Sequence, residues 1–197
     1  MTAEARRAQI ARKTNETDIS LTLNLDGVGT SRIHTGIGFL DHLFASLAKH
    51  ARLDLELACV GDLKVDDHHT AEDCALVLGA AIDRALGERR GISRFGAAYA
   101  PLDEALARAV VDLSGRAYAR VCLRLRRDRL GELSCENVAH VLSSLAVAAR
   151  ATLHVDVLRG ENDHHKAEAA FKAFALALRE AVRRDGAGTV PSTKGVL

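Results

Sequence analysis

The sequence is poor in several features that each mark a class of protein. It has no tryptophan and only two prolines in 197 residues. Its 27 basic and 26 acidic side chains nearly cancel, so no net charge attracts nucleic acid or an anionic membrane. No apolar run approaches the roughly 20 residues that span a bilayer. Because 48% of the residues are apolar, the sequence predicts a folded soluble protein without a nucleic-acid or membrane partner.

Cysteine is also scarce, and its placement bears on the compartment. The four cysteines are far apart and lack the two-residue spacing of zinc or redox motifs. We expect reduced thiols, as in a cytoplasmic protein. The first 18 residues are charged throughout and contain no apolar stretch of a secretory signal, which favours an unprocessed chain.

The chain contains an internal repeat. The segment DHHTAE at 67–72 returns 96 residues later as DHHKAE at 163–168, identical at five of six positions. Apolar residues follow both motifs at helical spacing, so each motif begins an amphipathic helix. A second pair of helical segments, around His42 and His140, precedes alternating strand patterns at 53–57 and 153–157. With strands expected at 19–26, near 33, at 105–113 and at 118–125, the repeated unit is β-β-α-β-α.

This order predicts an α+β fold of two tandem β-β-α-β-α half-domains, with helices packed against the sheets and a pseudo-two-fold axis. One unit alone leaves a sheet face open, whereas two units can cover each other. We therefore expect a single domain over 1–197. Its repeats would span about 10–90 and 97–185, with a linker at 87–96 and a C-terminal tail at 186–197.

Histidine is the residue that is unusually frequent, with nine copies. Six lie in the repeated segments, and each half has a glutamate four residues after a histidine. Residues four apart share one helix face, so each such His and Glu can hold one ion together. The second histidine of each pair must face elsewhere, which indicates two sites. The eight candidate metal ligands are His42, His68, His69, Glu72, His140, His164, His165 and Glu168.

Eight ligands over two ions give each about three imidazoles and one carboxylate, and open positions on a six-coordinate ion would permit catalysis. The absence of thiolates argues against a cysteine-rich structural zinc site, while manganese, iron, zinc and nickel all remain candidates. Of the other three histidines, His34 and His50 have no partner pattern and His154 lies on the non-apolar face of its expected strand, so we do not expect them to be ligands. We expect Asp66, Asp67 and Asp163 to cap helices or orient a ligand histidine.

Further motifs extend over nearly the whole chain. They include TNET at 14–17, TGIGF at 35–39, DDHHTAED at 66–73, RFG at 94–96, GEN at 160–162 and PSTKG at 191–195. In these motifs the chain resembles the imidazoleglycerol-phosphate dehydratase family of histidine biosynthesis. The resemblance implies a duplicated fold of the ribosomal protein S5 domain 2-like type, two Mn²⁺ per active site, and a homo-oligomer of 24 subunits with active sites between subunits.

The resemblance also implies a distribution of ligands over the two ions. One ion would take His42, His69, His164 and Glu168. The other would take His68, His140, His165 and Glu72. The phosphate contacts of the family correspond here to Arg94, Arg116, Lys172, Ser192 and Lys194, so the tail at 186–197 is expected to bind substrate. Without the resemblance, each of these five would be interpreted as an ordinary surface residue.

The implied reaction is loss of water from D-erythro-1-(imidazol-4-yl)glycerol 3-phosphate to give 3-(imidazol-4-yl)-2-oxopropyl phosphate. Glu16, Glu72 and Glu168 are the candidates for proton transfer, the last two being less free as metal ligands. Besides the phosphate set, the residues expected to contact substrate are Glu16, His42, His68, His69, Glu72, His164, His165 and Glu168.

Two other functions fit the same ligands. A two-metal hydrolase of a phosphorylated substrate would also use imidazole and carboxylate ligands, with an activated bridging water. A metal-dependent assembly module would use ions only to hold subunits together. The predicted phosphate-binding cations favour an enzyme, since assembly alone does not need them.

Overall fold

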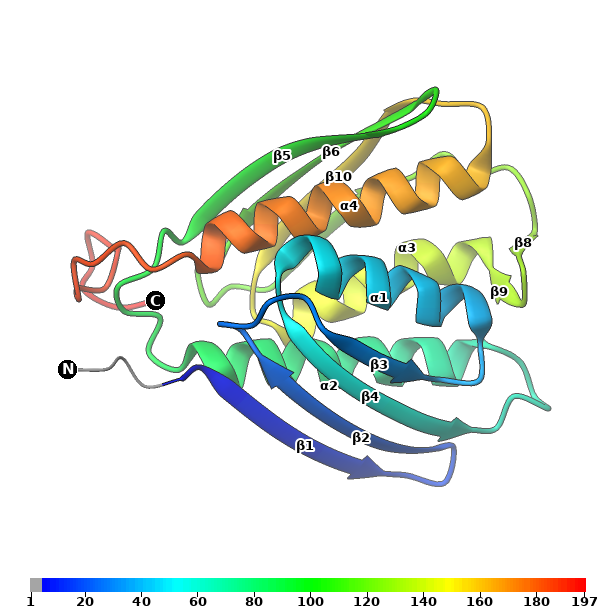
Figure 1. Ribbon diagram of the computed structural model, residues 1–197, viewed down its shortest axis with the longest axis horizontal. Coiled ribbons are helices and arrows are strands. Elements are labelled where there is room, and N and C mark those ends of the chain that lie inside the picture. The colour runs from blue at the N-terminus through cyan, green and yellow to red at the C-terminus, as the bar shows by residue number, and fades with distance from the viewer. Residues whose placement is uncertain (1–4) are drawn as a thin grey trace.

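The described residues of this computed structural model, 5–197, form two four-stranded sheets with four helices between them (Figure 1). Strands form where apolar and polar residues alternate; in the strand TDISLTLN every second residue is buried. The alternation fixes the register, because a shift by one residue would turn the apolar side to water. The first sheet consists, in spatial order, of β1 (Arg7–Lys13), β2 (Thr17–Asn24), β4 (Asp54–Gly61) and β3 (Ser31–His34).

The second sheet repeats the topology of the first. Its order β5-β6-β10-β7 matches β1-β2-β4-β3 strand for strand. In both sheets the last pair is parallel and the other pairs are antiparallel. Its strands are β5 (Phe95–Leu102), β6 (Ala105–Asp112), β7 (Tyr118–Cys122) and β10 (Thr152–Arg159), and a separate hairpin is formed by β8 (Arg129–Leu130) and β9 (Leu133–Ser134).

The helices form the layer between the sheets (Figure 1). Each half contributes two helices, and the halves interlock because α1 packs on α4 and α2 packs on α3. In addition, α2 lies on β1 and β2, while α4 lies on β5 and β6. The helices are α1 (Gly38–Ala51), α2 (His68–Leu86), α3 (Cys135–Ala148) and α4 (Asp163–Val182).

Small residues allow this layer to pack closely. Gly79 of α2 lies against the backbone carbonyl of Leu145 in α3, where an added Cβ would collide. Gly96 of β5 lies equally close to the carbonyl of Ala177 in α4. The first of these contacts joins the two halves and the second lies within the second half, and both restrict how the packed elements can slide past each other.

The expected α+β class, with helices packed on the sheets, is confirmed, and the structure adds a strand to the start of each half. The unit is therefore β-β-β-α-β-α, and the expected linker 87–96 ends where β5 begins. The added strands, β1 and β5, are edge strands, where charged residues, glycine and proline are tolerated. Their sequences, RAQIARK and FGAAYAPL, consequently give a weak strand pattern.

The C-terminal segment 186–197 has neither helix nor strand and lies along the loop before β5. Gly91 donates its backbone N–H to the Thr189 carbonyl, and the Arg94 guanidinium donates to the Pro191 carbonyl. Within residues 5–197, none of the helices is both long enough and apolar enough to cross a membrane.

Candidate metal centre

All four helices begin at the same end of the molecule, on the right in Figure 1. The histidine pairs lie at the starts of α2 and α4, and single histidines lie in the second turns of α1 and α3. Because α1 packs on α4 and α2 on α3, each pair lies beside the single histidine of the other half. Two groups of potential ligands result, and each combines residues from both repeats.

The first group consists of His42, His164 and Glu168, whose potential ligand atoms lie within 4.8 Å of one another. Glu168 Oε2 lies 3.1 Å from His42 Nε2 and 3.3 Å from His164 Nε2. Its other oxygen accepts from Lys172 at 2.7 Å. Burial acts to raise the pKa of Glu168, but hydrogen bonds from Lys172 and His42 outweigh it and lower that pKa to about 2. This carboxylate is therefore ionised and available to a cation.

The second group consists of His68, Glu72 and His140, again within 4.8 Å of one another. His140 Nε2 lies 2.8 Å from Glu72 Oε1. The rings of His68 and His140 are stacked, with centroids 4.9 Å apart and an angle of 26° between their planes. The i and i+4 spacing of His68 and Glu72 on α2 thus brings both side chains to the same place, as helix geometry predicts.

The second histidine of each pair faces away from these groups, as expected for neighbours on a helix. His69 Nδ1 lies 3.0 Å from an oxygen of Asp62, and His165 Nδ1 lies 2.7 Å from an oxygen of Glu104. These hydrogen bonds raise the pKa of both histidines. Within one chain, each group therefore contains three of its four predicted ligands. The missing ligand is His69 in the first group and His165 in the second.

Glu16, a predicted proton-transfer residue, lies in the turn between β1 and β2 with its Oε1 3.7 Å from His69 Nε2. The equivalent turn between β5 and β6 carries Glu104, which contacts His165. Glu104 was not among the site residues predicted from the sequence. The signal for it was the repeat itself, since both glutamates lie in the first hairpin of their half.

Asp66 and Asp163, two of the aspartates beside the histidine pairs, accept hydrogen bonds from backbone N–H groups, but only Asp66 does so in the manner of a helix cap. Asp66 Oδ1 accepts the N–H of His68, as a capping residue does. Asp163 does not cap its helix; it bonds to Lys166 and to two backbone N–H groups of the loop between β7 and β8. The α4 cap is Asn162, whose side chain accepts the N–H two residues later.

The residues expected to bind phosphate lie in two different places. Lys172 lies beside Glu168 in the first group. Arg94 instead donates its backbone N–H to Ala181 in the last turn of α4, about 25 Å along the helix from His164 at 1.5 Å per residue. Its guanidinium forms an ion pair with Asp112 at 2.7 Å.

Three further members of the predicted phosphate set lie at the same end as Arg94. Arg116 is exposed and follows Gly115, which lies against the C-terminal Leu197. Ser192 and Lys194 belong to the tail that contacts the loop before β5. A single chain therefore keeps most of these residues at the opposite end from its histidines.

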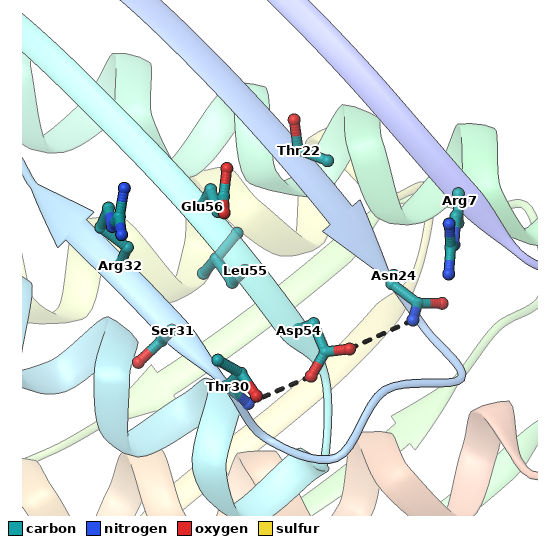
Figure 2. A pocket seen from close by; sticks show the side chains of 9 residues that line it. All are labelled: Arg7, Thr22, Asn24, Thr30, Ser31, Arg32, Asp54, Leu55 and Glu56. Carbon is teal, nitrogen blue, oxygen red and sulfur yellow. Dashed lines mark hydrogen bonds between the residues drawn. The ribbon is translucent and has the colours of Figure 1, made fainter.

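A separate hollow of about 320 Å³ lies on the outer face of the first sheet (Figure 2). Asp54 is positioned at one side of it and accepts from the Asn24 side chain at 3.2 Å and from the Thr30 N–H at 3.1 Å (Figure 2). No histidine is among its lining residues. The histidine groups, and not this hollow, are therefore the candidate functional site.

Comparison with known proteins identifies the family of a chain with this site. A family model described as imidazoleglycerol-phosphate dehydratase matches residues 35–178, which include both histidine groups. The chain belongs to the imidazoleglycerol-phosphate dehydratase family. The resemblance seen in the sequence motifs is thus confirmed. The members of this family are hydro-lyase enzymes.

Curated relatives with the name imidazoleglycerol-phosphate dehydratase match almost the full length of this chain. One from Phytophthora nicotianae is 62% identical over 98% of this chain, which spans only 42% of that longer protein. One from Kluyveromyces lactis is 51% identical, with all of both chains covered. One from Chlorobium luteolum is 55% identical over 100% of this chain and 98% of its own.

Two solved structures of the family share the fold. The imidazoleglycerol-phosphate dehydratase from Staphylococcus aureus subsp. aureus N315 is 35% identical, with a TM-score of 0.82 over 90% of this chain and 99% of its own. The enzyme from Pyrococcus furiosus, crystallised in complex with (S)-C348, is 36% identical, with a TM-score of 0.82 over 95% of this chain and 100% of its own.

Proposed function

We propose that this protein removes water from D-erythro-1-(imidazol-4-yl)glycerol 3-phosphate and forms 3-(imidazol-4-yl)-2-oxopropyl phosphate, a step of L-histidine biosynthesis. The observation that carries the proposal is the pair of His-His-Glu groups in a chain of this family. Each group leaves room for further ligands on a six-coordinate ion, as catalysis requires.

The donor atoms fit divalent metal ions, and we propose two Mn²⁺ per active site. Each group offers two imidazoles and one carboxylate within 4.8 Å of one another. This mixed nitrogen and oxygen set suits manganese and similar ions. When bound, the ions would stabilise negative charge on the substrate's imidazole ring and so make that ring an electron acceptor. The protein's ligands would hold both ions at fixed positions.

We further propose that the active sites form between subunits of a 24-subunit homo-oligomer. His69 and His165 face away from the groups of their own chain, and so are available to complete the groups of neighbouring chains. Arg94 and Arg116 lie far from the histidine groups of their own chain. In each active site, these two phosphate-binding residues would therefore come from a neighbouring chain. We place the reaction in the cytoplasm, in keeping with the four free cysteines.

The chain's own side chains would bind the substrate and move its protons. Arg94, Arg116, Lys172, Ser192 and Lys194 offer the cationic and hydroxyl groups that bind a phosphate dianion. Glu16 is our proposed proton-transfer residue, because it lies outside both ligand groups and next to His69. Glu72 and Glu168 belong to the two ligand groups and are therefore less free to transfer protons.

The proposal is tested by incubating the purified protein with Mn²⁺ and imidazoleglycerol phosphate. We expect the ketone product, with activity lost in a chelator and restored by added Mn²⁺. Protein that contains metal but forms no ketone would contradict the proposal. Release of inorganic phosphate instead would favour the two-metal hydrolase.

A further inference from the structure

Asn137 is a buried polar residue of α3 that bonds to two residues of the other half. Its side chain is 2% exposed. Its Oδ1 lies 2.9 Å from His68 Nδ1, and its Nδ2 donates to Asp67 Oδ2 at 3.0 Å. Asp67 is itself 6% exposed, and Ser134 donates to it from the backbone N–H at 2.6 Å and from the hydroxyl at 2.8 Å.

These contacts fix the orientation of the Asn137 amide. The Asp67 carboxylate accepts hydrogen bonds from the Ser134 N–H and hydroxyl, and an ionised carboxylate can only accept, so the NH₂ end of the Asn137 amide must face it. The carbonyl end of Asn137 then faces His68 and can only accept a hydrogen bond. His68 must consequently carry its proton on Nδ1, which leaves the lone pair of Nε2 for a cation.

The other histidine group lacks this arrangement. The α1 and α3 segments of the repeat are 98 residues apart, so Phe39 is the counterpart of Asn137. Phe39 lies beside His164, the counterpart of His68, with ring centroids 5.0 Å apart and a plane angle of 61°. The phenyl ring of Phe39 lacks the oxygen acceptor that the Asn137 amide offers to a histidine N–H. The two groups of the repeat therefore differ at this contact.

We infer that Asn137, oriented by Asp67, is a positioning residue that holds His68 in the tautomer required for metal binding through Nε2. The inference rests on the proposed function, because it concerns the metal ions proposed there. Carboxylate or carbonyl partners on the second nitrogen of a ligand histidine fix the ring and increase its basicity. Asn137 performs this role for one of the two metal positions only.

The test is a titration of the assembled, metal-free protein with Mn²⁺, in which electron paramagnetic resonance measures the free ion. We expect the unaltered chain to bind two ions per subunit. N137L, which has a side chain of similar size without an acceptor, should bind one ion normally and the other about 10 to 100-fold more weakly. N137A, which cannot cause a clash, should show the same site-selective loss.

S143A is the matched control, because it removes a side-chain hydrogen bond of the same helix, from Ser143 to the Ala139 carbonyl, and leaves the contacts among Asp67, Asn137 and His68 intact. It should bind both ions as the unaltered chain does. In solid-state ¹⁵N NMR of metal-free protein, N137L should add a second tautomer of His68. Normal binding of both ions by N137L and N137A, or equal weakening of both ions, would overturn the inference. Failure of the unaltered chain to bind Mn²⁺ would overturn the proposed metal dependence, and this inference with it.

Discussion

Glu168 of α4 lies 3.1 Å from His42 of α1, so residues from the two repeats meet in one cation-binding group. The contact exists because α1 packs on α4, which places the second turn of one helix beside the start of the other. The proposed metal ligands of this group are therefore held together by packing between the halves rather than within either.

Replacing Glu168 by Gln should weaken binding of one metal ion and leave the other in place. The substitution removes the charge that faces His42 and leaves the Lys172 ammonium without its carboxylate. Loss of a residue that only contacts a metal ligand lowers metal affinity by about 10 to 100-fold. Loss of the charge on a ligand itself should therefore lower metal affinity at least about 100-fold. Metal content after dialysis measures this. E180Q, on the exposed part of α4, is the control and should retain both ions.

Replacing Glu16 by Gln should reduce turnover while leaving the metal content unchanged. Glu16 lies outside both ligand groups, yet its Oε1 is 3.7 Å from His69 Nε2. Loss of a general acid or base lowers the rate by about 10² to 10⁴-fold. Steady-state rates and metal analysis of the same preparation check both parts. Unchanged turnover would remove Glu16 from the mechanism.

Replacing Arg116 by Ala should raise the KM for substrate strongly with less effect on kcat. Its guanidinium is exposed and would form charge-assisted hydrogen bonds to the phosphate. Hydrogen bonds to charged groups contribute about 1.5–3 kcal/mol, so KM should rise roughly 10 to 100-fold. R108A serves as control, because Arg108 pairs with Asp156 in the second sheet. Normal saturation of the Arg116 variant would show that it does not bind phosphate.

Replacing Gly79 by Ala should destabilise the fold. The new methyl group would meet the Leu145 carbonyl and push α2 away from α3. Overpacking of this kind costs about 1–3 kcal/mol, and each kcal/mol lowers the Tm by roughly 2–4 °C in a domain of this size. Thermal unfolding of G79A and of G38A compares a crowded with an open position, since a Cβ at Gly38 meets nothing within 4 Å. Equal Tm values for the two variants would show that α2 and α3 tolerate separation.

The Arg6–Asp26 pair should stabilise the protein at neutral pH and lose its effect in acid. Arg6 donates to Asp26 at 2.6 Å and to the Val182 carbonyl, which joins the start of the chain to the end of α4. The hydrogen bond from Arg6 lowers the pKa of Asp26 below its usual value. The stabilisation is therefore complete above the unfolded-state pKa, about 3.9, and disappears as the pH falls through the lower folded-state pKa.

Urea unfolding of D26N measures this dependence. The difference in unfolding free energy from the unaltered chain should be constant above about pH 5 and should shrink as the pH falls below about 4. D18N, which breaks the exposed pair with Lys13, should differ little from the unaltered chain at any pH. A difference for D26N that persists at low pH would show that the charge of Asp26 is not its cause.

The sequence by itself determined the repeat, the helices and the pairing of His68 with Glu72 and of His164 with Glu168. These features depend on local geometry, because residues four apart share a helix face whatever surrounds the helix. It also indicated that the second histidine of each pair faces elsewhere. It did not show β1 or β5, whose edge positions permit residues that obscure the strand pattern.

No local pattern showed which distant residues meet: the family resemblance implied that His42 and Glu168 share an ion, and only the tertiary structure showed their contact and that of Asn137 with His68. Packing of α1 on α4 brings His42 to Glu168, and packing of α2 on α3 brings Asn137 to His68. It also places Arg94 at the far end of α4 from the histidines. Contacts between residues about 70 to 130 positions apart depend on how two whole layers of the fold interlock, and no local pattern along the chain records that arrangement.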